Sequence, residues 1–373
     1  MPRYVRLKKE TFASGGNPII DLSVLPRGYR VMALLNTFRA LITQKAAGMT
    51  ALTHAQQDRI CKLVQLGGKG YDIGSHKATG RFLSILGQVM QGRDFSVVDT
   101  IPATASFAAE QYIKQALLFG DPNAADPNDT APRSEFFKDG GMQLDFCDVA
   151  ATFPNVNTIT GSVQTIAVLE DADPGAVHVR TETNVADFAG QTIKLAEKDA
   201  GFTHLVAYKE DGTDITEAEV SGVTLKVDGE PVYDGLEITD LAGLFNLAKS
   251  EGASTTDDAE AIGDQPPDVT TGGDVSLPFV PLYVAGGIGG RYKAADALHA
   301  REHILVEYTG SLTNLRLGWR AVRYADAAEF EARAVKLGYD PNTSRPKTAS
   351  KTDLDPRARI AGFIGRKFQV LGR

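Results

Sequence analysis

Two histidines that lie four residues apart are the first candidates for chemistry. His299-Ala300-Arg301-Glu302-His303 has the H-x-x-E-H spacing of one class of zinc site. That chemistry needs both histidines on one face of a helix, a third ligand and an open coordination position. A strand is expected to begin at Ile304, and a strand would direct the two side chains differently. We therefore interpret the motif as a polar lead into a strand and expect His299 and His303 to bind no metal.

Two glycine clusters could in principle hold a phosphate group. They are Gly286 to Lys293 (GGIGGRYK) and Gly67 to Gly70 (GGKG). A phosphate-binding loop of the Walker type needs a lysine followed by serine or threonine and then a helix. Lys293 is followed by Ala294, and Lys69 is followed by glycine. Both clusters therefore predict turns, because glycine adopts backbone conformations that other residues avoid.

No other arrangement of residues predicts an enzyme. No serine sits in a G-x-S-x-G motif, and the remaining histidines are scattered. Carboxylates are plentiful, but no spacing singles out a pair of the kind that glycosidases use. Glu329, Glu331 and Arg333 are expected on the solvated face of a helix. We expect no cofactor and no catalytic residue.

Length and composition describe a globular chain of two or three domains. The sequence has 373 residues and 43% hydrophobic residues. No apolar run approaches the roughly 20 residues that span a bilayer, and no apolar segment follows the basic N-terminus as in a signal peptide. We expect synthesis and folding in a cytoplasm. Cys61 and Cys147 lie in separate apolar contexts and are expected to be buried thiols rather than a disulfide.

Charge is distributed unevenly along the chain, whose net charge is −8. Residues 170–274 contain 24 acidic and 6 basic residues, whereas residues 345–373 contain 8 basic and 2 acidic residues. The acidic overall charge argues against general nucleic-acid binding. The acidic middle can be a solvated, solubilising surface. Alternatively, both basic ends lie on one side of the molecule and face an anionic surface such as a membrane.

Internal duplication is the strongest structural signal. Leu144-Asp145-Phe146 and Val306-Glu307-Tyr308 share one pattern of an apolar, an acidic and an aromatic residue. Other features match in the same order, 162 to 173 residues apart: Ile20 to Ser23 with Ile193 to Ala196, Arg27 to Val31 with Ala200 to Val206, and Tyr71 and Gly80 with Tyr233 and Gly243. A repeat of such long period predicts a duplicated structural unit.

The elements of both halves are expected to be mostly short strands. The strand candidates are 31–43, 59–66, 82–90, 107–119, 140–146, 159–170, 177–183, 223–227, 276–284, 304–308 and 312–324. Asp211-Gly212 and Asp228-Gly229 predict hairpin turns. Helices are expected at 241–249 and 326–336, and an exposed acidic loop at 251–273. Many short strands with frequent turns are typical of β-sandwiches.

The proline, glycine and charge of residues 171–175 indicate a domain boundary. The expected organisation is an N-terminal arm (1–19), a first sandwich (20–172), a second sandwich (176–325), and a helix with a basic C-terminal tail (326–373). The fold class is therefore all-β, with two sandwiches in one chain and a few short helices.

The order of these features resembles the double jelly-roll major capsid proteins of the tectivirus, corticovirus and adenovirus lineage. The resemblance covers roughly residues 20–325. It rests on His76 to Leu83 (HKATGRFL), Ile101 to Thr104 (IPAT), Tyr112 to Pro122, and Gly140 to Phe146. In that family a Gly-aromatic segment, an Ala-Pro-Ala-Thr-like turn, an apolar-aromatic strand and a short Leu-acid-Phe strand occur in this order.

The resemblance implies that each sandwich is a jelly roll, that the two stand side by side, and that three chains form a trimer that tiles an icosahedral virion. Implied partners are neighbouring trimers, minor capsid or vertex proteins and an internal membrane of a tailless bacteriophage, with no specific nucleic-acid sequence. The expected interior-facing or membrane-facing basic residues are Arg3, Arg6, Lys8, Lys9, Arg357, Arg359, Arg366 and Lys367. The alternatives are a carbohydrate-binding or hydrolytic β-sandwich and another virion component of the spike or tail.

Overall fold

The chain divides into two compact units in the computed structural model. The first comprises residues 1–185 with 210–213, and the second 186–209 with 214–373. The structure describes residues 2–44, 57–68, 76–91, 108–121, 123–124, 131–153, 156–171, 179–196, 200–245, 276–292, 296–300, 302–324, 339–340 and 345–346.

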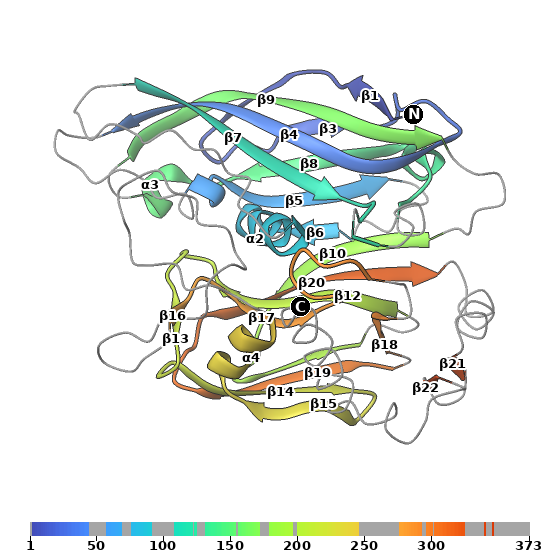
Figure 1. The fold of residues 1–373 in the computed structure, drawn as a ribbon. Helices are drawn as coiled ribbons and strands as arrows, with labels where there is room; N and C mark the ends of the chain where they lie inside the picture. The colour runs from blue at the N-terminus through green and yellow to red at the C-terminus, as the bar shows by residue number, and fades with distance from the viewer. Residues whose placement is uncertain are drawn as a thin grey trace, which may run out of the picture. The chain divides into compact units, whose positions relative to one another are not determined.

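Two sheets form the first unit (Figure 1). Its strands are β1 (Arg3–Arg6), β2 (Glu10–Ala13), β3 (Ile19–Asp21), β4 (Tyr29–Gln44), β5 (Cys61–Gly68), β6 (His76–Ala78), β7 (Ala108–Leu118), β8 (Gly140–Phe146), β9 (Val156–Asp171) and β10 (Val179–Asp187). One sheet has the order β1-β9-β4-β7, and β2 also pairs with β9. The other has the order β10-β6-β5-β8-β3, in which β10 and β6 are parallel.

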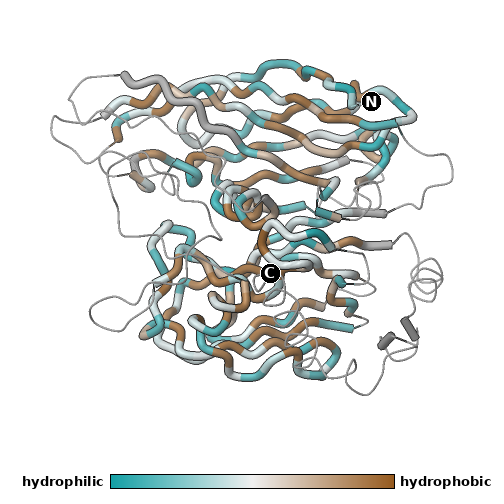
Figure 2. Tube along the Cα trace, viewed as in Figure 1, coloured by the Kyte–Doolittle hydropathy of each residue, from teal (hydrophilic) through white to brown (hydrophobic). Residues whose placement is uncertain are grey.

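The inward-facing side chains of these two sheets form the core of the first unit. Along β8 every second residue is buried, as expected for a strand with one face on the core. Phe146 stacks on Phe12 with ring centroids 3.9 Å apart, and both rings meet Phe38 edge-on. Figure 2 shows that apolar residues follow the paired strands while polar residues gather at turns. Alternating patterns of this kind made these strands predictable.

The second unit has the same kind of layers. Its strands are β11 (Thr192–Leu195), β12 (Ala200–Lys209), β13 (Ile215–Thr216), β14 (Val220–Val227), β15 (Glu230–Leu236), β16 (Ser276–Leu277), β17 (Val280–Val284), β18 (Leu298–Ala300), β19 (Ile304–Gly310) and β20 (Leu315–Tyr324). One sheet has the order β11-β19-β14-β15. In the other, β12 pairs with β17, β18 and β20. β13 pairs with β16. Farther along the chain, β21 (Tyr339–Asp340) pairs with β22 (Arg345–Pro346).

Both units share one pairing scheme, which confirms the duplication. In the first, β8 pairs with β3 and β5, and β5 pairs with β6. In the second, β19 pairs with β11 and β14, and β14 pairs with β15. The other sheets agree as well, since β4 pairs with β7 and β9, and β12 pairs with β17 and β20. Leu144 on β8 and Val306 on β19 therefore lie on equivalent strands.

The residues of the two units do not correspond with one constant register. Between one pair of equivalent strands and the next, the correspondence shifts by two residues. Ile20 lies opposite Met142, whereas Ile193 lies opposite Val306. The sequence matches of Ile20 with Ile193 and of Leu144 with Val306 therefore cannot both hold in register. A difference of two residues keeps each side chain on the same face of its strand, so both matches preserve the hydrophobic pattern.

Residues 82–90, expected as a strand, form a helix instead. α2 spans Gly80–Gln91, and Thr79 caps it by accepting a hydrogen bond from the Phe82 backbone N–H. Its buried side chains recur at helical spacing: Phe82, Leu83, Ile85, Leu86, Val89 and Met90. The helix expected at 241–249 is α4 (Ile238–Phe245). Each lies between corresponding strands of its unit. The shorter helices are η3 (Ser134–Phe137) and α3 (Val149–Thr152).

The N-terminal segment, expected as an arm over residues 1–19, contributes two strands to the first sheet. β1 and β2 both pair with β9 in antiparallel register. Leu7 and Phe12 are buried and anchor the segment in the core. Each strand has only four residues, so neither is long enough for a clear alternating pattern.

The division between the units falls at Val185 and Ala186, beyond the expected boundary at 171–175. The reason is β10, which follows the Pro-Gly segment but pairs with β6 of the first unit through Thr183 and His76. The Asp228-Gly229 hairpin is confirmed, since it joins β14 to β15 with positive φ at both residues. Asp211-Gly212 is a turn, but it leads to β13, which pairs elsewhere. The expected 251–273 loop and 326–336 helix lie outside the described residues.

Candidate functional site

The basic residues of the N-terminus are held on and beside β1. The Arg3 guanidinium donates a hydrogen bond to the Tyr29 hydroxyl at 3.1 Å and lies 5.3 Å from the centre of that ring. Arg6 Nε donates to Gln164 Oε1 at 2.8 Å. Register places Arg3 opposite Leu169 and Arg6 opposite Ile166, and these two residues of β9 face opposite sides of the sheet. The two arginines therefore cannot both face one flat surface.

Two lysines follow the strand and are exposed to solvent. Lys8 Nζ lies 2.8 Å from Glu10 Oε1, and its hydrogen bond to this carboxylate, with their charge attraction, raises the pKa of Lys8. Lys9 is also exposed. Arg357, Arg359, Arg366 and Lys367, the other half of the expected basic surface, lie outside the described residues. The structure thus describes four of the eight expected basic residues, and it does not place Arg3 and Arg6 on one face.

The paired histidines lie on a strand and on the segment after it. His299 belongs to β18, opposite Gly201, and is buried. Its Nδ1–H donates to the Ala297 carbonyl oxygen at 2.8 Å. His303 lies just before β19, where its backbone N–H donates to Asp228 Oδ1. The two histidines therefore do not lie on one helix, as we expected from the strand that begins at Ile304.

No group of three potential metal ligands occurs among the described side chains. That His299 and His303 bind no metal stays a prediction. Elemental analysis of the purified protein tests it, with His303→Ala for comparison. One zinc per chain that is lost in the variant would contradict it.

Burial lowers the pKa of His299 to about 4, from 6.5, because desolvation disfavours the charged ring. The folded state therefore binds this proton more weakly than the unfolded chain. The contribution of the neutral His299 ring to the free energy of unfolding is fully present above pH 6.5. It is lost as the pH falls from 6.5 to 4. The loss should reach about 3 kcal/mol. Urea unfolding across this range measures it, and His299→Gln should flatten the slope. An unchanged slope in that variant would contradict the assignment.

The glycine-rich loop after β17 is a compact turn. The Gly287 N–H donates to the Val284 carbonyl, and the Gly290 N–H donates to the Gly287 carbonyl. A Cβ atom at Gly290 would lie 2.0 Å from the Gly286 carbonyl oxygen. Close approach of the backbone to itself therefore explains these glycines, as the absence of a Walker motif predicted.

Both cysteines are buried thiols, as expected, and both lie in the first unit. Burial raises the pKa of Cys61 strongly, with a further contribution from the charge of Asp145. Burial also raises the pKa of Cys147. Since the thiolate is the reactive form, both groups should be inert in the folded protein.

We expect no reaction of Cys61 or Cys147 with a disulfide reagent such as dithionitrobenzoate in the native protein. Unfolding in urea should expose both thiols and give two equivalents of product per chain, since the sequence has two cysteines. Fast reaction of one equivalent without urea would contradict the burial of that thiol.

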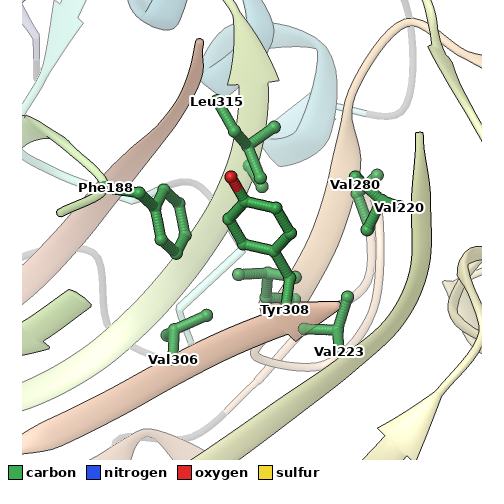
Figure 3. Close-up of a pocket in the computed structure, with 9 residues that line it drawn as sticks. Phe188, Val220, Val223, Val280, Val306, Tyr308 and Leu315 are labelled. Carbon is green, nitrogen blue, oxygen red and sulfur yellow. The ribbon is translucent and has the colours of Figure 1, made fainter. Parts of the chain in front are cut away.

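One small cavity lies in the core of the second unit (Figure 3). Its volume is about 10 Å³, and its walls are formed by apolar side chains and the ring of Tyr308, which Phe188 meets edge-on. This volume is at the lower limit for a single water molecule, and the walls offer it no polar surface. The cavity is a packing defect rather than a ligand site.

No described helix is long and apolar enough to cross a membrane.

The arrangement of strands is shared with proteins of virus particles. No protein-family model and no curated protein matches the chain. The crystal structure of the major capsid protein of bacteriophage PM2 aligns with 87% of this chain and 98% of its own, with a TM-score of 0.51 and 12% identity. A chain of Sulfolobus Turreted Icosahedral Virus aligns with 100% of this chain and 99% of its own, with a TM-score of 0.54 and 10% identity.

A third structure, VP54 of PBCV-1, aligns with 87% of this chain and 93% of its own, with a TM-score of 0.51 and 10% identity. At such low identities the likeness concerns the fold. Because the two units repeat one strand topology within one chain, and 87 to 100% of the chain aligns with these structures, the fold is the double jelly roll of viral major capsid proteins.

Proposed function

We propose that this chain is the major capsid protein of a tailless icosahedral bacteriophage whose shell encloses a membrane. The observation that carries the proposal is the repetition of one strand-pairing scheme in both units. Two similar units give each chain two of six similar positions in a ring, so a closed trimer with a pseudo-hexagonal outline is the natural symmetry. Such trimers cover a surface by contacts with neighbouring trimers and with minor proteins at the vertices.

The protein acts as a building block and not as an enzyme. In support, the chain shares its fold with the major capsid protein of bacteriophage PM2. The buried histidine and cysteine side chains lie in packed surroundings.

The mass and shape of the purified protein test the proposal. Light scattering should give three times the chain mass of 39.9 kDa at micromolar concentration. Electron microscopy should show particles with six lobes. A stable monomer that binds oligosaccharides would favour the alternative of a carbohydrate-binding sandwich and contradict the proposal.

The basic ends of the chain, in this proposal, face the interior of the shell. Lys8 and Lys9 support it, because both are exposed next to β1. Each basic group near an anionic lipid surface contributes on the order of 1 kcal/mol. Protease treatment tests this orientation. Residues 345–373 should be protected in intact particles and cut in free trimers, and equal cutting in both would contradict it.

A further inference from the structure

The outward face of the sheet formed by β1, β9 and β4 has an unexpected composition. Alternate residues of β9 are buried, including Val163, Ala167 and Leu169, so Ile166 and Val168 point to the opposite side. Residues directly paired across strands share a face, which adds neighbours from β1 and β4. We define the Arg6 face by Tyr4, Arg6, Leu35, Arg39, Ile166 and Val168.

This face combines apolar side chains with arginine and tyrosine. Tyr4 is 66% exposed, the highest value among the large hydrophobic residues that the structure describes. Arg6 and Arg39 are exposed, and Gln164 orients Arg6 through its hydrogen bond. Between Thr158 and Val168 on β9, and between Leu35 and Thr43 on β4, no residue is acidic, and Glu170 is the first acidic residue that follows on this face of β9. Aromatic residues and arginine are enriched at protein interfaces, whereas acidic residues are depleted.

The outward faces of the other sheets have the polar composition of surfaces in contact with water. On β14 and β19 of the second unit, Lys226 pairs with Glu307 at 3.2 Å. On β8 of the first unit, Gln143 donates to Asp145 at 2.6 Å. Lys62 and Lys77 are exposed on β5 and β6. The Arg6 face differs from them because Leu35, Ile166 and Val168 add apolar side chains beside polar Thr37 and Gln164.

A complementary surface exists on the second unit. β15 and α4 carry four exposed acidic residues and, from residue 230 to residue 245, no lysine or arginine. We define the acidic strip by Glu230, Asp234, Glu237 and Asp240. These residues extend over the end of one hairpin and the first turn of a helix, where half-buried Leu236 adds apolar surface.

We propose that the Arg6 face of one copy binds the acidic strip of a second copy. The inference rests on the proposed trimer and identifies its subunit contact. Pairing of two Arg6 faces would oppose like charges, which disfavours a symmetric dimer through this face. A contact between two different surfaces is head-to-tail, and such contacts generate closed rings. Each of three copies then contributes one Arg6 face and one acidic strip.

Charge reversal tests the contact on both sides. Arg6→Glu/Arg39→Glu should weaken trimer formation about tenfold or more, as measured by light scattering over a dilution series. Glu237→Lys/Asp240→Lys should weaken it similarly. The four changes combined in one chain should restore the trimer, because the charges are complementary again. The control is Lys62→Glu/Lys77→Glu, which reverses two exposed charges of the first unit outside the Arg6 face and should leave the trimer intact.

Thermal unfolding of each variant shows whether it folds. Recovery of the trimer in the combined variant would show independently that the four changes do not prevent folding. If the wild-type protein is a trimer and both double variants remain trimers, the proposed contact is wrong, while the proposed function stands. A wild-type monomer would instead contradict the proposed function. If the Arg6 variant remains a trimer but loses binding to phosphatidylglycerol vesicles, the face contacts a membrane and the proposed subunit contact is wrong.

Discussion

Replacing Gly80 with alanine is expected to destabilise the first unit strongly. A Cβ atom at this position would lie 2.2 Å from the Asp58 carbonyl oxygen and 2.6 Å from the Cys61 carbonyl oxygen. Both are backbone atoms, so neither can move aside without shifting the segment that leads into β5. Gln115 Nε2 would be 2.4 Å away. We expect a loss of about 3 kcal/mol or more in the free energy of unfolding, a large part of the stability of a domain.

The matched control is Gly243→Ala in α4, the corresponding helix of the second unit. No atom lies within 4 Å of a Cβ there, and the position is exposed. Alanine in a helix is more favourable than glycine by up to about 1 kcal/mol, so this change should be neutral or stabilising. Equal effects of the two changes would contradict the close approach at Gly80.

Two spectroscopic probes can assign the unfolding to one unit. The only tryptophan, Trp319, lies on β20 of the second unit, and both cysteines lie in the first. In Gly80→Ala we expect the thiols to react at low urea concentration while the tryptophan fluorescence still shows a folded second unit. Simultaneous loss of both signals would mean that the two units unfold together.

The strands were predictable where a pattern extends over several residues. β8 alternates fully, and the repeat of its pattern in β19 indicates the duplication from the amino-acid sequence alone. Gly80 and Gly243 were matched correctly to corresponding elements, but the first of these was expected as a strand. The apolar residues between Phe82 and Met90 lie close together in the sequence. Their helical spacing becomes evident only from the burial of Phe82, Ile85 and Val89. Short apolar runs do not distinguish a helix from a strand by periodicity alone.

The candidate surface could be predicted only in part. Charge counts identified the basic N-terminus and the acidic middle of the chain. The opposite directions of Arg3 and Arg6 depend on the pairing of β1 with β9, which is a long-range contact. The Arg6 face combines residues from three strands that are far apart in the sequence, so only the register brings Tyr4 next to Val168. A linear pattern contains no such information.

Removing the carboxylate of Asp58 is expected to have the second large effect. Asp58 Oδ2 lies 3.6 Å from Arg81 Nη1, and the two side chains are only 4% and 7% exposed. Asp58→Ala leaves the guanidinium charge in a buried environment without this partner. Loss of one member of a buried ion pair costs about 3 to 5 kcal/mol, because water cannot solvate the remaining charge. Unfolding in urea, monitored by the reactivity of the two thiols, measures this loss of stability in the first unit.

Two comparisons separate the cost of a stranded charge from the value of the pair itself. In Asp58→Leu/Arg81→Met both charges are replaced by apolar groups, and the loss should be clearly smaller than in Asp58→Ala. Glu307→Ala breaks the Lys226–Glu307 pair, whose side chains are 33% and 40% exposed, and should cost less than about 1 kcal/mol. If Asp58→Ala costs no more than Glu307→Ala, the buried charge of Arg81 is compensated by other groups and the ion pair does not hold α2 in place.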